Sequence, residues 1–351
     1  MSKTETEPHT ESTMSQQTIK VVSAADFARN FGAREAFALD ILVGLSEQRK
    51  RIPSQYMYDA EGSRLFDKIT QLDEYYPTKC ELDILERCAG RFAELADNQP
   101  FNLVEFGAGS ALKASYLIEA FLKHNLDFQY VPIDISHSAL EKLADDMTRR
   151  FPDLELTALI SEYFTGIKWL NNRYRRKNIA IFLGSSIGNF SHAEARVFLR
   201  SMWNCLNNGD NLIIGFDLKK DIELLVKAYN DSEGVTAAFN FNVLERINRE
   251  LGGEFDISKF RHIGTYDVFS GAMESYLVSL EAQDVFIDAI GRSFKFGPWE
   301  PIHIEYSYKY LESDIETLAA ETGFEVIEHI YDSNRWFIDS FWRVKKTDSN
   351  G

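Results

Sequence analysis

Two short segments carry the residue types that bind a nucleotide-like ligand. Residues 103–110 (LVEFGAGS) form an apolar run that ends in an acid and breaks into Gly-x-Gly. Residues 130–134 (YVPID) form a second apolar run, which ends in Asp134. Glycine has no Cβ, so the backbone N–H groups of such a turn can approach a ligand. An acid at the end of the next strand accepts hydrogen bonds from ribose hydroxyls, and the pair therefore predicts a nucleotide-type cofactor site.

The residues around the glycines favour S-adenosylmethionine over a nicotinamide cofactor. Glu105 stands before the glycines, and Ser110 and Ala111 stand where a dinucleotide-binding fold has its third glycine. A nicotinamide-dependent oxidoreductase would need that glycine after Gly109. We expect no metal site, because none of the seven histidines pairs with another at ligand spacing and the three cysteines lack a metal-binding spacing.

Composition excludes several other classes of protein. The chain has 351 residues, 44% hydrophobic and 26% charged, which is typical of globular proteins. Its net charge of −16 argues against a nucleic-acid partner, which would need a basic surface. No run approaches the roughly 20 apolar residues that span a bilayer. Residues 1–18 contain no apolar block and predict a disordered tail without a signal peptide. We expect a cytoplasmic monomer that binds neither nucleic acid nor membrane.

Strand-like runs then alternate with helical segments in the rhythm of a parallel α/β sheet. The runs cover residues 102–106, 129–134, 156–160, 179–183 and 211–216. After residue 217 this rhythm stops. Residues 220–250 are predicted to be helical and residues 257–310 to form extended segments. Residues 323–327 and 336–342 have the pattern of two further strands.

A terminal pair of strands after a last helix closes the mixed sheet of methyltransferases. The predicted fold is therefore α/β, a Rossmann-like class I methyltransferase fold with a seven-stranded mixed sheet. This cofactor-binding domain would combine residues 80–219 with residues 310–351. Residues 19–79 and 220–309 would form a second, α+β domain that binds the substrate over the ligand edge of the sheet.

Longer motifs carry a resemblance to a known family. They include residues 57–60 (MYDA), 74–78 (EYYPT), 182–189 (FLGSSIGN) and 228–240 (AYNDSEGVTAAFN). With them the chain resembles, from about residue 25 to its end, the ergothioneine-pathway L-histidine Nα-methyltransferases, which depend on S-adenosylmethionine. The resemblance implies methylation of the α-amine of L-histidine. Up to three transfers would give the betaine hercynine.

The resemblance also implies roles for individual residues. The positions that match cofactor contacts are Gly107, Lys113, Asp134, Glu162 and Tyr163, with Asp134 as the ribose acceptor. Two groups of positions match contacts to the substrate: Asn189 and Tyr229 to the carboxylate, and Tyr75, Glu305 and Ser307 to the imidazole. The positions that match the surroundings of the reacting amine are Tyr58, Phe66, Gly184 and Ser186, with Tyr58 as the catalytic residue. Ser275 stands where the family commonly has a methionine against the substrate ring, which weakens the expected preference for histidine.

The chemistry explains why such residues are needed. Methyl transfer is an in-line displacement by an amine lone pair, so the site must align the two substrates and favour the neutral amine. Tyr58 is expected to orient or relay the amine proton, with water as the final acceptor. An alternative substrate for the same chemistry is another amino acid, such as tryptophan or a thiolated histidine. A non-catalytic binding protein would have no need of Tyr58, Asn189, Tyr229 and Glu305 together.

Overall fold

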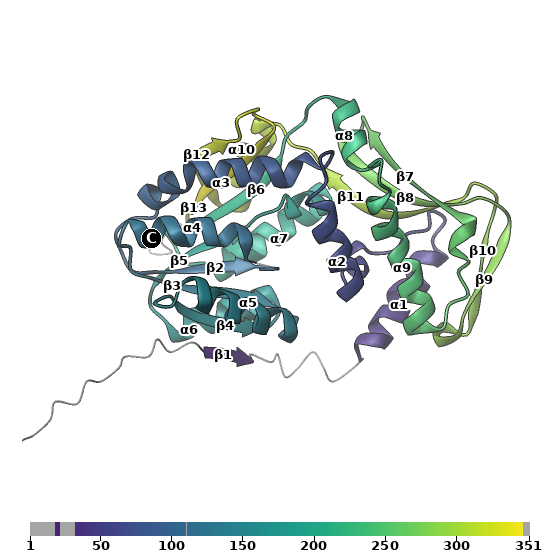
Figure 1. Ribbon diagram of the computed structural model, residues 1–351, viewed down its shortest axis with the longest axis horizontal. Helices are drawn as coiled ribbons and strands as arrows, with labels where there is room; N and C mark the ends of the chain where they lie inside the picture. The colour runs from purple at the N-terminus through teal and green to yellow at the C-terminus, as the bar shows by residue number, and fades with distance from the viewer. Residues whose placement is uncertain (1–17, 22–31, 110, 347–351) are drawn as a thin grey trace, which may run out of the picture.

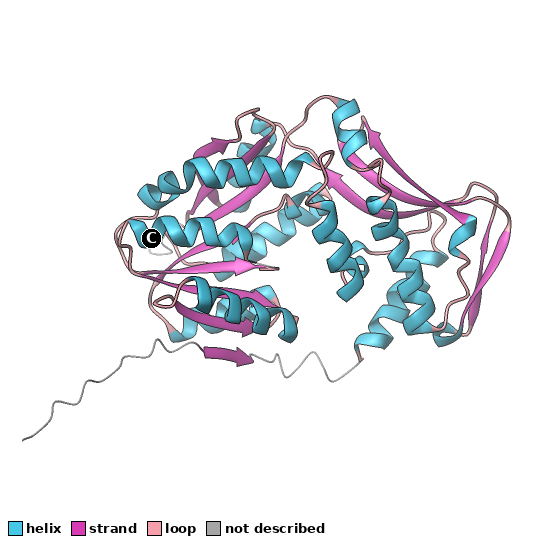
Figure 2. Ribbon diagram, viewed as in Figure 1, coloured by secondary structure: helices cyan, strands magenta, loops and turns pink. Residues whose placement is uncertain are grey.

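The computed structural model describes residues 18–21, 32–109 and 111–346, and its main body is a large mixed β-sheet (Figures 1 and 2). The strand order is β1-β4-β3-β2-β5-β6-β13-β12. The bounds of these strands are β1 (Thr18–Val21), β2 (Phe101–Phe106), β3 (Phe128–Asp134), β4 (Glu155–Ile160), β5 (Lys177–Phe182), β6 (Asn211–Asp217), β12 (Phe324–Tyr331) and β13 (Phe337–Val344). Strands β2 to β6 pair in parallel, and β13 runs antiparallel to both β6 and β12.

This sheet confirms the predicted seven strands and adds an eighth. Strand β1 pairs in parallel with β4, so residues 19–21 belong to the cofactor sheet and not, as predicted, to the substrate domain. Thr18 is likewise a strand residue. The rest of the predicted disordered tail, residues 1–17, lies outside the described residues. Four residues are too few for a reliable sequence signal, and the pairing depends on the open edge of a distant strand.

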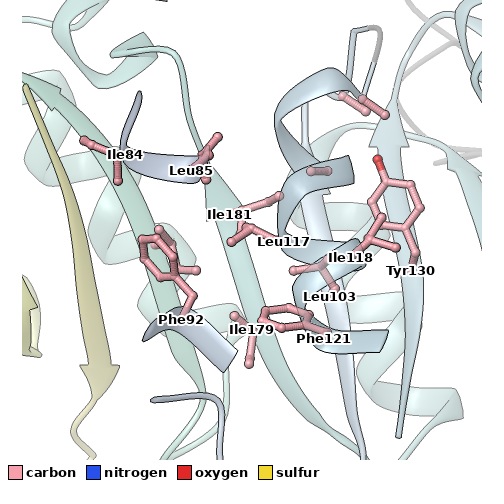
Figure 3. Packing of buried hydrophobic residues seen from close by; sticks show 14 of the residues in the cluster. Ile84, Leu85, Phe92, Leu103, Leu117, Ile118, Phe121, Tyr130, Ile179 and Ile181 are labelled. Atoms are coloured by element: carbon pink, nitrogen blue, oxygen red, sulfur yellow. The ribbon is translucent and has the colours of Figure 1, made fainter. Parts of the chain in front are cut away.

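Helices cover both faces of the large sheet (Figure 1). The covering helices are α3 (Tyr76–Leu95), α4 (Leu112–Lys123) and α5 (His137–Arg150) on one face, and α6 (Tyr163–Arg173), α7 (His192–Cys205) and α10 (Glu312–Thr322) on the other. Because both faces are covered, β2 and β6 are buried along their whole length. Figure 3 shows one face of this core, with side chains from α3 and α4 packed on those of β2, β3 and β5.

The second body lies beyond the carboxyl ends of the parallel strands (Figure 1). Its helices are α1 (Ala33–Ser46), α2 (Ala60–Ile69), α8 (Ile222–Ala228) and α9 (Val235–Leu251), with 3-10 turns η1 (Ser54–Met57), η3 (Ile257–Lys259) and η4 (Asp288–Ile290). Its strands are β7 (Phe260–Asp267), β8 (Ala272–Ser279), β9 (Gln283–Ile287), β10 (Arg292–Phe296) and β11 (Pro301–Tyr308). They form a sheet in the order β11-β8-β7 and a separate β9–β10 pair.

The predicted helix over residues 220–250 is in fact two helices, α8 and α9. Asp231 accepts hydrogen bonds from the backbone N–H groups of Val235 and Thr236 at the start of α9, and Gly234 takes a positive φ of 71° there. Of the predicted domain boundaries, the one after residue 79 lies inside α3. Tyr76, in the first turn of that helix, already belongs to the core of the large sheet. None of the described helices is both long and apolar enough to cross a bilayer.

Candidate active site

A cleft of about 2750 Å³ lies where the carboxyl edge of the large sheet meets the second body. Gly107 and Asp134 line it from the ends of β2 and β3. Tyr58, Tyr229 and Glu305 line it from the second body. Two halves of one cleft therefore contain the residues predicted to bind the cofactor and those predicted to bind the substrate.

The glycine turn after β2 forms a cradle that a side chain would fill. Gly107 has a positive φ of 71°, and a Cβ placed there would lie 2.7 Å from the hydroxyl of Tyr163. Asp134 ends the neighbouring strand and accepts a hydrogen bond from the backbone N–H of Ser136 at 2.9 Å. Burial raises the pKa of Asp134 above its ordinary value, and burial together with Asp134 raises the pKa of Tyr163 to about 12. The cradle and the carboxylate suit a ribose-containing ligand.

A buried glutamate joins the two halves of the cleft. Glu81, in α3, is completely buried and forms an ion pair with Lys113 of α4. Its other oxygen accepts a hydrogen bond from the backbone N–H of Gly184 at 2.7 Å. Asp339 of β13 is also buried, and burial together with Glu81 raises the pKa of Asp339 well above its ordinary value. Glu81 thus fixes both Lys113 and the loop that follows β5.

Aromatic rings form the wall of the substrate half. The ring of Tyr58 contacts Phe66 edge-on at 5.7 Å and Phe239 at 5.3 Å between centroids. Tyr75 contacts Phe66 and Tyr229, each at 6.3 Å. Burial, with smaller effects of Glu305, Tyr75 and Tyr229, raises the pKa of Tyr58 well above 10. Tyr58 therefore stays a neutral phenol, although 41% of its surface is exposed to the open cleft.

Polar side chains meet at the inner end of this aromatic wall. Asn189, in the 3-10 turn η2 (Ser186–Asn189), donates a hydrogen bond to Glu305 Oε1 at 3.1 Å. The Tyr229 hydroxyl donates to Ser307 Oγ at 2.6 Å. Burial raises the pKa of Glu305 to about 7, and the positive charge of Lys309 opposes this rise. Residues from η2, from β11 and from the position directly after α8 thus combine an acceptor, an amide and two hydroxyls in one place.

Comparison with known proteins agrees with this geometry. A family model for histidine-specific, S-adenosylmethionine-dependent methyltransferases matches residues 37–344. The chain belongs to this family. It is 34% identical to a histidine N-alpha-methyltransferase of Mycolicibacterium smegmatis, over 86% of this chain and 93% of the relative. It is 33% identical to a protein of the same name from Mycobacterium tuberculosis, over 91% and 96% of the two chains.

A longer fungal relative matches as well. Ergothioneine biosynthesis protein 1 of Schizosaccharomyces pombe is 30% identical over 85% of this chain, which spans 39% of that protein. Membership of the methyltransferase family accounts for the fold and makes the chain an S-adenosylmethionine-dependent enzyme. Among the described residues, no group of three or more His, Cys, Asp or Glu could hold a metal ion.

Most of the predicted site residues line the cleft, but two do not. Those that line it are Tyr58, Phe66, Tyr75, Gly107, Lys113, Asp134, Tyr163, Gly184, Ser186, Asn189, Tyr229, Glu305 and Ser307. Glu162, predicted to contact the cofactor, is exposed just before α6 and does not contribute to the wall. Ser275, predicted to face the substrate ring, lies directly across from Glu305 in the β8–β11 ladder but is buried and does not contribute to the wall.

Other functional residues were not predicted from the sequence. Glu81, Asp217 and Lys309 are fully or almost fully buried charged residues. Glu81 and Lys309 contact predicted site residues directly, and Asp217 pairs with Lys309. One sequence signal could have indicated Asp217, because it ends strand β6 as Asp134 ends β3. A second signal could have indicated Lys309, which continues the alternation of Glu305 and Ser307 at steps of two.

Proposed function

We propose that this enzyme methylates the α-amine of L-histidine, in up to three transfers that give hercynine for ergothioneine biosynthesis. One observation carries the choice of substrate: Glu305 is a half-buried carboxylate in the wall of the cleft, held by Asn189 and followed on the same strand face by Ser307. An acceptor and a hydroxyl at this spacing suit the two nitrogens of an imidazole. The family match and the histidine N-alpha-methyltransferase relatives support the same substrate.

The cofactor half of the cleft fits S-adenosylmethionine, which supplies a methyl group already activated on a sulfonium. Gly107 leaves room for close approach of a ligand, and Asp134 offers oxygens to ribose hydroxyls. Lys113, held by Glu81, offers a positive charge to a carboxylate. Gly184 allows this lysine to lie close to the loop after β5, because a Cβ there would lie 3.1 Å from the Lys113 ammonium nitrogen.

In this proposal Tyr58 orients the reacting amine and does not act as a base. An amine attacks only through its lone pair, so it must lose a proton before each transfer. The pKa of Tyr58 is well above 10, so the phenol keeps its own proton at neutral pH. It can accept a hydrogen bond from the amine, while the proton that the amine loses goes to water. Glu162 and Ser275 take no part in this mechanism.

We expect Tyr58→Phe to lower kcat about tenfold, because one hydrogen bond to the amine is lost from the transition state. Histidine binding should change less than threefold, since the phenyl ring that remains in the variant would keep its contacts with Phe66 and Phe239. Single-turnover rates and calorimetric affinities of both proteins would measure the two effects. A variant with the wild-type rate would exclude a role for the hydroxyl.

Histidine binding should strengthen as the pH rises from 6 to 8. The pKa of Glu305 is raised to about 7, so a rising pH converts it to the carboxylate that accepts the ring N–H. The imidazole of the ligand, with an ordinary pKa of about 6.5, becomes neutral over the same range. Hercynine is the best probe, because its trimethylated amine does not titrate. In Glu305→Gln the part of the pH dependence near pH 7 should disappear, and an unchanged profile would contradict this assignment.

Titration calorimetry tests the choice of substrate directly. L-Histidine, hercynine and L-tryptophan would each be titrated into the enzyme, with and without S-adenosylhomocysteine. We expect histidine and hercynine to bind and tryptophan not to bind, because an indole has one N–H and no ring acceptor to face Ser307. Tryptophan binding, or binding of S-adenosylhomocysteine alone, would overturn histidine as the substrate and leave a methyltransferase that acts on another compound.

A further inference from the structure

Lys309 directly follows β11 and lies wholly buried behind the substrate half of the cleft. Its ammonium nitrogen is 2.8 Å from Asp217 Oδ2, 2.9 Å from the Tyr229 hydroxyl and 2.7 Å from Ser307 Oγ. An ammonium group has three N–H donors, and each of these contacts can take one of them. These three contacts therefore fix the orientation of the Lys309 ammonium group. Two of its three N–H donors bind the site residues Tyr229 and Ser307.

The surrounding charges make this cation unusual. Asp217 is completely buried and pairs with two ammonium groups, those of Lys309 and Lys220. Burial opposes ionisation of Asp217, but the two ammonium groups hold its pKa below the ordinary value. The hydrogen bonds of the Lys220 side chain go to Asp217 and to the Tyr76 hydroxyl, away from Tyr229 and Ser307. One carboxylate thus faces two cations, and only Lys309 contacts the substrate side.

The contacts with Lys309 and the hydrogen bond between the two hydroxyls together decide which way Ser307 can donate. A hydroxyl has one hydrogen to donate and two lone pairs that accept. Lys309 donates to both oxygens, and the Tyr229 hydroxyl donates to Ser307 Oγ at 2.6 Å. Ser307 Oγ therefore accepts twice, which uses both of its lone pairs. Its own hydrogen is the one group left to bind a ligand, so Ser307 can face an acceptor but not another donor. Tyr229 gives its one hydrogen to Ser307 and therefore has none left for the substrate carboxylate that it was predicted to bind.

We propose that Lys309 is a positioning residue that makes Ser307 an obligate donor and so selects a neutral imidazole in one tautomer. This inference rests on the proposed histidine methylation. Glu305, as a carboxylate, only accepts and must face the ring N–H, while Ser307 must face the ring nitrogen that carries a lone pair. An imidazolium has two N–H groups and no acceptor, so Ser307 would lack a partner. An indole has one N–H and no ring acceptor, so it too would leave Ser307 without a partner.

The test measures histidine affinity by calorimetry at saturating S-adenosylhomocysteine, in wild type, Lys309→Met and the matched control Lys220→Met. Each variant removes one of the two cations and leaves Asp217 paired with the other. We expect Lys309→Met to lose about 10- to 100-fold in histidine affinity, because the donor is no longer held by a charged group. Lys220→Met should stay within about threefold of wild type, and S-adenosylhomocysteine affinity should be unchanged in both variants.

A double-mutant cycle separates this role from a merely structural one. If Lys309 acts through Ser307, Lys309→Met/Ser307→Ala should bind histidine about as weakly as Ser307→Ala alone. The inference would be overturned if the affinity losses of the two single variants multiplied in the double variant. It would also be overturned if Lys309→Met bound histidine as tightly as wild type. Should Lys309→Met fail to fold, Lys309→Gln removes the charge but keeps a donor toward Asp217, and the same loss is expected. A wild-type enzyme that does not bind histidine would instead overturn the proposed function.

Discussion

Replacing Glu305 with glutamine should weaken histidine binding about 10- to 100-fold, as large a loss as we expect from any single change at the site. The carboxylate accepts the ring N–H as a charged group, and such hydrogen bonds contribute roughly 1.5–3 kcal/mol. Glutamine keeps the shape of the side chain and an oxygen toward Asn189, so the pocket should stay intact. Titration calorimetry with L-histidine at saturating S-adenosylhomocysteine measures the loss.

The matched control is Glu274→Gln. Glu274 lies on β8, one residue before the position that pairs with Glu305, so its side chain points to the opposite face of the sheet. It accepts a hydrogen bond from Tyr276 there and also lines the cleft. We expect histidine affinity to change little in this variant. If Glu305→Gln and Glu274→Gln lost the same histidine affinity, the loss would follow from removing any negative charge near the cleft. Glu305 would then have no particular role in recognition of the ring.

The largest loss of stability should follow from Asp217→Asn. The change leaves the ammonium groups of Lys220 and Lys309 buried without a carboxylate. Removal of one partner from a buried ion pair typically costs about 3–5 kcal/mol in the free energy of unfolding. Urea unfolding followed by circular dichroism measures it. Asp73→Asn is the control, because Asp73 pairs with Lys79 at the surface, and its variant should unfold like wild type.

The same network predicts how stability depends on pH. The folded enzyme holds the pKa of Asp217 below its ordinary value of about 3.8. Its contribution to stability is therefore complete above that value and is lost as the pH falls through the lower pKa of the folded state. Asp217→Asn should reduce this acid-dependent part of the unfolding curve. An identical pH dependence in the two proteins would show that Asp217 does not titrate as the network requires.

The sheet was predictable because its strands carry a local signal. Strands β2 and β6 are buried on both faces, so their sequences are nearly continuous apolar runs that end in the turn or acid of the ligand edge. Strand β1 gave no such signal, since four residues acquire their strand character from pairing with β4. The break between α8 and α9 depends on Asp231 and Gly234, whose role in capping is clear only once the helices are in place.

The site was predictable in part and for a different reason. Gly107 and Asp134 follow from local chemistry, whereas Glu305 was chosen through the family resemblance, because a lone glutamate in an alternating strand is usually solvated. Glu81 and Lys309 were missed because charged side chains are rarely buried unless paired. Their partners come from elements far apart in the sequence, as the contact between Lys309 and Asp217 illustrates. Such pairs leave no local pattern.

One measurement tests the central proposal most directly. The purified enzyme would be incubated with S-adenosylmethionine and an equimolar mixture of L-histidine, L-tryptophan and a thiolated histidine, and the products identified by mass spectrometry. We expect methylated histidine as the main product, with up to three methyl groups on the α-nitrogen and one molecule of S-adenosylhomocysteine formed for each methyl group transferred. Preferential methylation of either competitor, or methylation of a ring nitrogen of histidine, would contradict it.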